Sequence, residues 1–316
     1  MKRKLYSIGV MTLGLGMLVF SSANAATLVA HSQGATLPNA PDYRWWYGCS
    51  PTSAGMMMGY YDINGYGGQT YNNLVPGATA KLSNYDNPGA AANQMIASSG
   101  HITDYYPGGN GASGDDLPRP THAHDSLADF MGTSQDSVGN KNGETKFWNR
   151  TDGGKLYAKD IYNAGASSYN NSGMFGMWEY FDYAGYGSGS GNASRDINFF
   201  NQYTDNYHDD GFTLTDYQAE IDAGRTVMIH VEGHSMFGYD YDGTNIILHD
   251  TWTEGEHTME WGGSYPYLDK SLSLRSVTCF TPTGGEPVPV PATCILLGSG
   301  LLGLAGLRRK SGAKKA

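Results

Sequence analysis

The chain is organised around residues 48–62, which read Gly48-Cys49-Ser50-Pro51-Thr52-Ser53-Ala54-Gly55-Met56-Met57-Met58-Gly59-Tyr60-Tyr61-Asp62. Ser50 or Cys49 can cap a helix here, and Pro51 suits a first turn, where a missing N–H costs nothing. The apolar residues repeat at the i, i+3, i+4 and i+7 spacing of one helix face, at Ala54, Met57, Met58 and Tyr61. The pattern predicts a helix over residues 50–62 with Cys49 at its N-terminus.

Further along the chain, helical patterns give way to strand patterns. Helices are expected near 90–98 and over 122–132, 153–164 and 214–223, the last opened by Thr215 and closed by Gly224. Strands are expected over 226–231, 235–241, 244–249, 257–261 and 274–280, with Asp242-Gly243 as a hairpin turn. Helices followed by an antiparallel sheet indicate an α+β fold.

The composition excludes several classes of protein. The 316 residues include 44 Gly and 23 Tyr, and only 16% are charged, unlike a disordered chain or a long helical bundle. Residues 26–286 contain 12 of the 20 basic and all 30 acidic residues, a net charge of −18. A body this acidic repels a phosphate backbone, so we expect no binding of nucleic acid.

The N-terminus reads as a targeting segment. Lys2-Arg3-Lys4 is basic, Leu5 to Phe20 is apolar, and Ala23-Asn24-Ala25 fits the small-residue cleavage rule. These features predict a secretory signal peptide over residues 1–25. The domain that follows is expected over residues 26–285.

The C-terminal residues 286–316 also read as a targeting segment. Pro287-Val288-Pro289-Val290-Pro291 is a stiff spacer. Residues 292–307 are apolar, and as a helix they measure about 24 Å, less than the bilayer core of about 30 Å. They therefore predict a marginal, transient membrane anchor, with a buried C-terminal helix as the alternative. The basic Arg308-Arg309-Lys310 places the C-terminus in the cytoplasm and the body outside.

This segment resembles the PEP-CTERM sorting signal of bacterial envelope proteins. Pro289-Val290-Pro291 stands where the signal usually has Pro-Glu-Pro, and the apolar helix and the Arg pair match. The resemblance implies an exported bacterial protein that is processed by an exosortase-type enzyme. It also implies a location in the cell envelope or the extracellular matrix.

Cys49 has the setting of a reactive thiol. An ordinary thiol has a pKa of about 8.5 and is mostly protonated at neutral pH. Unpaired N–H groups and the dipole at a helix N-terminus stabilise the thiolate, usually by about 0.3–1 kcal/mol, which is less than one pKa unit. A partner imidazolium is therefore needed to ionise most of the thiol.

His234 is the expected partner, in the segment Gly233-His234-Ser235. There its ring can reach from the sheet toward a helix end. Asp250 ends the next strand, and its carboxylate can hydrogen-bond the distal ring nitrogen of His234 and keep the ring aimed. Trp252 can cover that bond from water. Strand alternation turns His249 to the opposite face, so we assign it a structural role.

These motifs resemble those of the C39-like branch of the papain-fold cysteine peptidases. The match lies in Gly48 to Met56, Gly233-His234 and His249-Asp250-Thr251-Trp252, and the order Cys, His, Asp agrees. The resemblance implies a papain-like fold in which a helical lobe carries the nucleophile at a helix N-terminus and packs on an antiparallel sheet. It also implies a peptide or protein substrate, no cofactor, and Cys49 as nucleophile, His234 as acid–base and Asp250 as orienting residue.

One departure from the family pattern bears on activity. The family usually has a Gln about six residues before the Cys as an oxyanion donor, but this chain has Tyr43, followed by Arg44. A phenol or a guanidinium is the substitute that the sequence offers, and losing one such donor typically costs about 10²–10³ in rate. Two alternatives to a peptidase therefore stay open: a weak or inactive matrix adhesion protein, and an acyl or peptide transferase that uses the same three side chains.

The cysteines and histidines of this chain can also have purely structural roles. Cys49 and Cys279 can pair in a disulfide or pack in the core, while Cys294 lies in the sorting segment. Histidines and acids cluster at 122–125 and at 208–210, and His230 lies near His234, but none has the spacing of a zinc motif. We therefore predict no metal site.

Overall fold

The structure is a computed structural model. It describes residues 37–86, 90–105, 123–135, 138–141, 143–187 and 193–287. The predicted signal peptide and the predicted membrane anchor at 292–307 lie outside these residues. Among the described residues, no helix is long and apolar enough to cross a bilayer.

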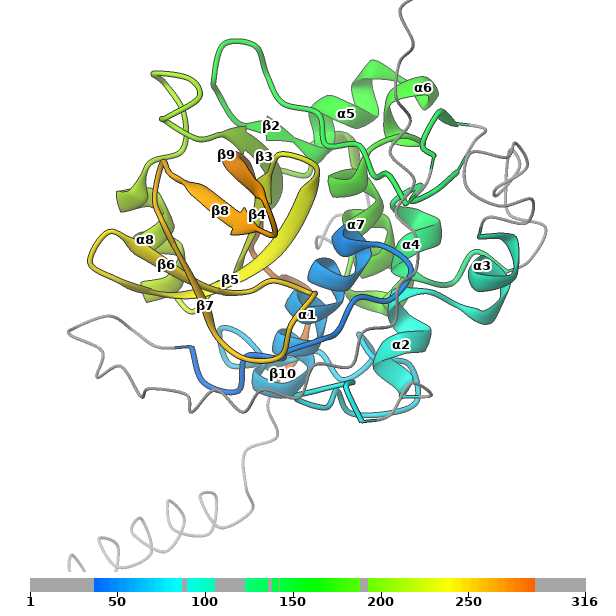
Figure 1. Cartoon of the computed structure of the whole chain (residues 1–316). Coiled ribbons are helices and arrows are strands. Elements are labelled where there is room, and N and C mark those ends of the chain that lie inside the picture. Colours follow the sequence, from blue (N-terminus) through cyan, green and yellow to red (C-terminus); the bar gives the residue numbers. More distant parts are fainter. Residues whose placement is uncertain are drawn as a thin grey trace, which may run out of the picture.

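The first helix, α1 (Cys49–Asn64), has most of the other helices on one side and the sheet on the other (Figure 1). The predicted helix at 50–62 is confirmed, and Cys49 is its first residue. The prediction of one apolar face is wrong, because every residue from Ser50 to Asp62 is buried. Helices pack against α1 on one side and the sheet packs against it on the other, so small residues such as Ser53 and Ala54 face partners all around the helix axis.

An antiparallel sheet of eight strands forms the other half of the described chain (Figure 1). Seven strands follow one another in space in the order β2 (Leu156–Tyr157), β3 (Phe199–Tyr203), β9 (Lys270–Phe280), β4 (Val227–Val231), β5 (His234–Asp242), β6 (Asn245–His249) and β7 (His257–Glu260). The eighth, β8 (Ser264–Tyr267), pairs with β9. The predicted α+β class with an antiparallel sheet is confirmed.

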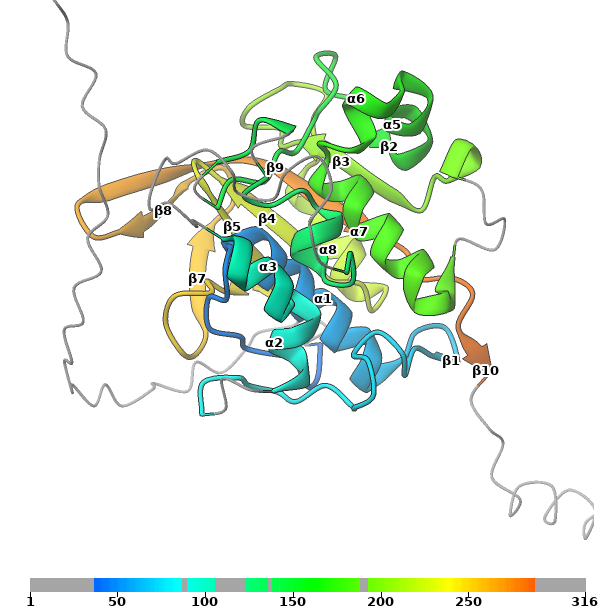
Figure 2. The ribbon, with the colours of Figure 1, turned by 90° about the vertical axis from the view of Figure 1, so that its right-hand side faces the viewer.

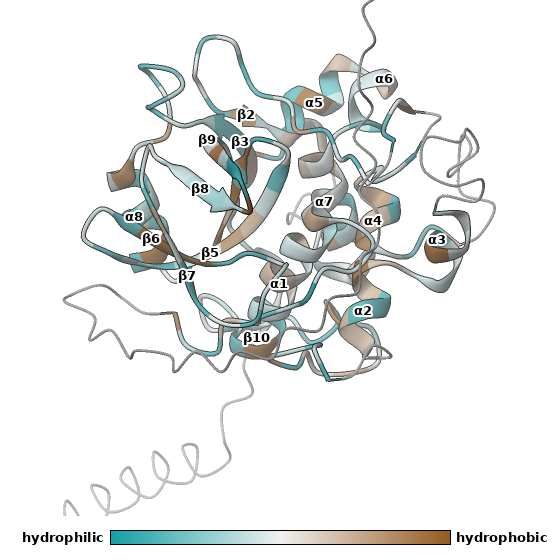
Figure 3. Ribbon diagram, in the orientation of Figure 1, coloured by the Kyte–Doolittle hydropathy of each residue, from teal (hydrophilic) through white to brown (hydrophobic). Residues whose placement is uncertain are grey.

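The sheet is where sequence patterns predict the fold best. The five predicted strands correspond to β4, β5, β6, β7 and β9, and Gly243 turns the chain between β5 and β6 with φ 60°. Hydrophobic residues mark β6 in Figure 3, and Ile246, Ile247 and Leu248 are buried there. Three strands of this sheet, β2, β3 and β8, are not predicted by the sequence patterns. In β3 the residues Phe199–Tyr203 are nearly all buried and so lack the alternation of a half-exposed strand.

The face of the sheet away from α1 is covered by α8 (Leu214–Asp222), at the left of Figure 1. The Tyr217 hydroxyl donates to the main-chain oxygen of Asp240 in β5 at 2.9 Å. The helix is capped by Thr213, whose side chain accepts from the N–H of Asp216, and not by the predicted Thr215. Gly224 follows the helix with φ 79°, as expected for a residue that ends it.

Shorter helices form the lobe around α1. They are α2 (Ala91–Ile96), α3 (Ser99–Asp104), α4 (Leu127–Phe130), α5 (Ala158–Ala164), α6 (Ala166–Tyr169) and α7 (Gly173–Phe181), with a π-helical turn at Asp182–Tyr186 and a 3-10 turn at Ala193–Arg195. The helix predicted over 122–132 is only one turn long, and that predicted over 153–164 begins with β2. Two short strands, β1 (Gln69–Thr70) and β10 (Glu286–Pro287), pair beyond the C-terminal end of α1 (Figure 2).

Candidate active site

Gly48 holds the turn that brings Cys49 to the start of α1. Its φ of 141° disfavours other residues, and a Cβ there would lie 2.8 Å from Pro51 and 3.0 Å from Thr133. The Thr52 hydroxyl donates to the main-chain oxygen of Gly48 at 2.6 Å and accepts from the N–H of Trp46 at 3.0 Å. The first turn of the helix therefore fixes the backbone on both sides of Cys49.

His234 contacts the Cys49 thiol through a side-chain hydrogen bond. It is the first residue of β5, and the two-residue turn Glu232–Gly233 joins it to β4. Burial of the thiol raises its pKa, but the charge of His234, its hydrogen bond and the N–H of Ser235 act against burial, and the pKa of Cys49 ends below its ordinary value. The predicted pairing of Cys49 with His234 is therefore present in the structure.

The second nitrogen of His234 is held by a main-chain oxygen. Nε2 lies 2.7 Å from the carbonyl oxygen of Asp250. A carbonyl oxygen only accepts, so Nε2 carries a proton in every protonation state of the ring. In the neutral ring, Nδ1 is consequently the basic nitrogen, and it is the one left for Cys49.

The carboxylate of Asp250 does not bond to His234, and this part of the sequence prediction is wrong. Its Oδ1 accepts from the N–H groups of Trp252 and Thr253, both at 2.8 Å. Its Oδ2 accepts from the hydroxyls of Thr253 at 3.0 Å and Tyr265 at 2.8 Å. The side chain of Asp250 thus folds the loop after β6, and that loop presents the main-chain oxygen to His234.

Trp252 covers the His234 ring, as predicted. The two ring centroids are 3.4 Å apart and the planes meet at 13°. Tyr267 stacks on the other side of Trp252, with centroids 3.8 Å apart. This stack of three rings limits the rotation of His234 and shields its bond to Asp250 from water.

Cys49 and His234 open into a cleft of about 320 Å³ between the helical lobe and the sheet. One wall is the segment 143–149, and the other is formed by the ends of β3, β4 and β5 and by the middle of β9. The lining combines apolar and aromatic residues with a few polar ones, among them Phe147, Asn149, Tyr203, Tyr207, Val231 and Arg275. Cys49 as a residue is only partly buried, and it lines this cleft together with His234.

Neither predicted oxyanion donor reaches this cleft. The Tyr43 side chain is fully buried and its hydroxyl donates to the main-chain oxygen of Lys81 at 2.8 Å. Arg44 lines a separate cavity of about 350 Å³ together with Trp45 and Tyr85. The sequence hypothesis for these two residues is therefore wrong.

The other cysteine and histidine predictions can be compared with the structure directly. Cys49 and Cys279 are both free, and Cys279 is buried in β9, so the alternative of a disulfide between them is absent. His249 is buried and lies 2.8 Å from the main-chain oxygen of Pro41, in agreement with the structural role assigned to it. Across the described residues, no three His, Cys, Asp or Glu side chains group as a metal site would require.

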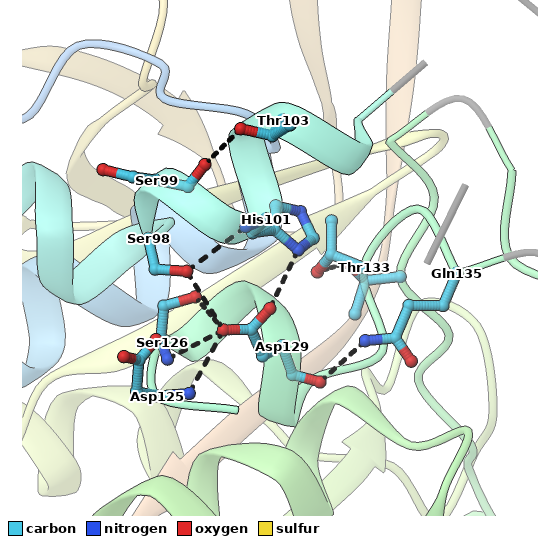
Figure 4. A network of polar contacts seen from close by, with 10 residues as sticks. Ser98, Ser99, His101, Thr103, Asp125, Ser126, Asp129, Thr133 and Gln135 are labelled. Carbon is cyan, nitrogen blue, oxygen red and sulfur yellow. Dashed lines mark hydrogen bonds and ion pairs between the residues drawn. The ribbon is translucent and has the colours of Figure 1, made fainter. Parts of the chain in front are cut away.

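A second histidine–aspartate pair lies in the helical lobe (Figure 4). His101 of α3 and Asp129 of α4 are 3.1 Å apart, and their side chains are 1% and 0% exposed. Asp129 also accepts from the N–H and the hydroxyl of Ser126. The sequence analysis did not single out this pair, since no local motif links two residues that are 28 positions apart.

Comparison of the chain with protein-family models, with curated proteins and with solved structures finds no match.

Proposed function

We propose that this chain is a thiol-dependent amide hydrolase, a cysteine peptidase with a papain-like arrangement of helical lobe and sheet. The observation that carries the proposal is the meeting of Cys49 and His234 in an open cleft, with Cys49 at the start of a helix and the ring held from behind by Asp250. A cysteine that lines a cleft and whose pKa is lowered by a neighbouring histidine is the setting in which cysteine acts as a nucleophile.

The residues have the following roles in this proposal. The Cys49 thiolate attacks the carbonyl carbon of a bound peptide, and His234 then gives the proton on Nδ1 to the leaving amine. The thioester that remains is attacked by water, which His234 deprotonates, and the acid product and the thiol are released. Asp250 is a positioning residue that acts through its main-chain oxygen, so Nε2 keeps its proton throughout.

The oxyanion is stabilised by N–H groups of the chain itself. The N–H of Cys49 opens the helix and is free of an intrahelical partner by position. Asn149, a carboxamide that lines the same cleft, supplies the second donor in this proposal. Removal of one such donor commonly costs about 10²–10³ in rate.

The targeting segments extend the proposal to a place of action. The signal peptide at 1–25 and the sorting segment at 286–316 support an exported protein that is held at the bacterial cell envelope or in the extracellular matrix. An exosortase-type enzyme would process the C-terminal segment. Peptides or proteins outside the cell would be the substrates.

The test is peptide hydrolysis by the purified protein and by its Cys49→Ala and Cys49→Ser variants. We expect turnover in the natural protein and none in either variant, with far-UV circular dichroism and Tm unchanged. A fluorogenic peptide library provides the substrates, because the cleft does not define the sequence. Cys279→Ser is the matched control, since Cys279 is buried in the sheet and lines no part of the cleft, and it should keep full activity.

Two outcomes would point elsewhere. Ligation of an added amine to the acyl fragment, in place of hydrolysis, would identify a transferase that uses the same residues. A natural protein that is inert, with a Cys49 thiol that reacts like free cysteine, would rule out both enzymes. The non-enzymatic matrix protein would then be the better account, and the position of Tyr43 and Arg44 outside the cleft favours it.

A further inference from the structure

A β-bulge brings an arginine into the cleft. His230 in β4 pairs with Ser276 in β9, and the next pair is Val231 with Leu274, so Arg275 is the extra residue of β9 at this point. Arg275 and Ser276 both line the cleft, whereas neighbouring residues of a regular strand point to opposite faces of the sheet. Bulges re-aim side chains in this way and are common beside active sites.

Two neighbours orient the Arg275 side chain. Its guanidinium is ion-paired with Glu232 through a hydrogen bond from Nη2. Its Cζ lies 4.7 Å from the centre of the Tyr207 ring, which is a cation–π contact. Glu232 belongs to the turn between β4 and β5, two residues before His234. The arginine is therefore tied to the turn that leads into the proposed acid–base residue.

These two contacts leave part of the guanidinium without a partner. A guanidinium donates from each of its nitrogens. Only Nη2 is bonded to Glu232, and Nε and Nη1 donate to no residue in the described part of the chain. The Arg275 side chain is 37% exposed and the residue lines the cleft, so a ligand in the cleft can approach these donors.

The other charges around the cleft determine which ligands such an arginine can favour. Among the described residues that line the cleft, Arg275 is the only arginine or lysine, and Glu144 on the opposite wall is the only carboxylate. His230 is neutral, because burial lowers its pKa to about 3. The net charge of −18 on residues 26–286 repels an acidic molecule at long range, so only a short-range contact can favour one.

We propose that Arg275 is a specificity-determining residue that binds a carboxylate of the peptide substrate. The inference rests on the proposed function and deepens it, since it names acidic peptides as the preferred substrates. A planar guanidinium matches a carboxylate with paired N–H donors, which a neutral side chain cannot accept equally well. The carboxylate comes from a Glu or Asp side chain or from a free C-terminus. Glu232 competes for the same guanidinium and so limits the affinity.

The test measures peptide binding by isothermal titration calorimetry to the full chain with Cys49→Ala, which cannot turn a peptide over. The probes are acetylated hexapeptide amides of Ala and Phe in which one Glu occupies each position in turn. Matched sets carry Gln or Lys instead, and one further peptide has a free C-terminal carboxylate and no Glu. At least one Glu peptide should bind about tenfold more tightly than its Gln counterpart. A preference for the free acid alone would identify the C-terminal carboxylate as the group bound.

Two substitutions in this background should act in opposite directions. Arg275→Gln should abolish the difference between acidic and neutral peptides and leave the affinity for Gln peptides within about twofold. Glu232→Gln frees the guanidinium and should raise the affinity for acidic peptides about threefold or more. The double variant should resemble Arg275→Gln, because Glu232 acts only through the arginine. In chains that retain Cys49, Arg275→Gln should raise KM for acidic peptides and leave kcat for neutral peptides unchanged, whereas a merely structural role would lower kcat for all peptides alike.

The comparison of Glu with Gln peptides needs no change at Arg275, so it decides the proposal even if Arg275→Gln fails to fold. Equal binding of the acidic and neutral peptides would overturn the proposal, and so would a preference for the Lys set. Weaker binding of acidic peptides to Glu232→Gln would also contradict it. A natural protein that binds acidic peptides selectively but hydrolyses none of them would instead defeat the proposed function and leave the carboxylate site standing.

Discussion

The described chain holds two buried histidines whose rings are each fixed by an aspartate, and they differ in a way that bears on function. His101 in the helical lobe meets the carboxylate of Asp129, and both side chains are sealed from solvent. His234 at the start of β5 meets the main-chain oxygen of Asp250, and its other nitrogen faces a thiol in an open cleft. A carboxylate partner is therefore not what distinguishes the histidine of the proposed active site. Access to a cleft and a neighbouring sulfur distinguish His234 from His101.

The largest expected effect separates the two histidines directly. His234→Ala should lower kcat/KM for peptide hydrolysis by about 10⁴-fold or more, because the thiolate loses its counter-charge and the leaving amine its proton donor. Tm should fall by a few degrees as well, since the variant loses the bond to the Asp250 oxygen and the stack on Trp252. Steady-state kinetics and a thermal melt on the same samples provide the measurement.

The matched variant, His101→Ala, should lower the stability of the protein without lowering its activity. It removes a donor from the buried Asp129 carboxylate, which typically costs about 2 kcal/mol, so Tm should fall by several degrees. Activity per folded molecule should stay within about twofold of the natural protein, because α3 and α4 contribute no residue to the cleft. A large loss of kcat with an unchanged Tm would break the contrast between the two pairs.

A second prediction concerns the oxygen that holds His234. Asp250→Asn keeps the main-chain oxygen and leaves Oδ1 to accept from the N–H groups of Trp252 and Thr253. The loss in kcat should stay within about tenfold. Asp250→Ala removes the loop contacts and should cost about 10²-fold, because a misplaced ring loses near-attack geometry.

If the carboxylate itself oriented the ring during catalysis, Asp250→Asn would instead present the wrong tautomer and cost about 10⁴-fold. That result would make the two histidine–aspartate pairs alike. Tyr265→Phe removes one donor to the same carboxylate and serves as a mild control, with an expected loss below tenfold.

The smallest expected effect concerns a third carboxylate, that of Asp42. It accepts a hydrogen bond from the N–H of Gly255 at 2.7 Å. This bond joins the loop after β6 to the segment before Cys49. Burial raises its pKa from 3.8 to about 6, and the charges of Glu254 and Asp250 add to this. Because the folded pKa is raised, the stabilisation is complete below about pH 4 and is lost as pH rises through 6. Asp42→Asn should therefore raise Tm by a few degrees at pH 8 and leave it unchanged at pH 4.

Thermal melts across this pH range test the prediction, and Asp152→Asn is the control. Asp152 is exposed and its pKa is lowered to about 2, first of all by its hydrogen bond with Arg150, so its replacement should bring no gain in stability at pH 8. Equal Tm values for Asp42→Asn and the natural protein at pH 8 would show that the Asp42 carboxylate is not destabilising when ionised.

Local patterns were enough to predict α1 with Cys49 at its start and the strands β4 to β7 and β9. Each depends on periodicity, capping or turn chemistry within about ten residues. The patterns failed where packing overrides local preference. The helix α7, with Gly173 and Gly176 inside it, has poor intrinsic helix propensity and depends on burial of Phe175, Met177 and Trp178.

The types and order of the residues established that a thiol, an imidazole and an acid were available and that the first begins a helix. Which atoms of those residues meet was decided by packing. Asp250 turns its carboxylate into its own loop because four donors wait there, and this leaves only its main-chain oxygen for His234. His230 in β4 is hydrogen-bonded to Ser235 in β5 and to Thr278 in β9. These hydrogen bonds exist only once the three strands have paired in the sheet. Hydrogen bonds depend on angstrom distances between atoms, and sequence spacing does not encode such distances between segments far apart in the chain.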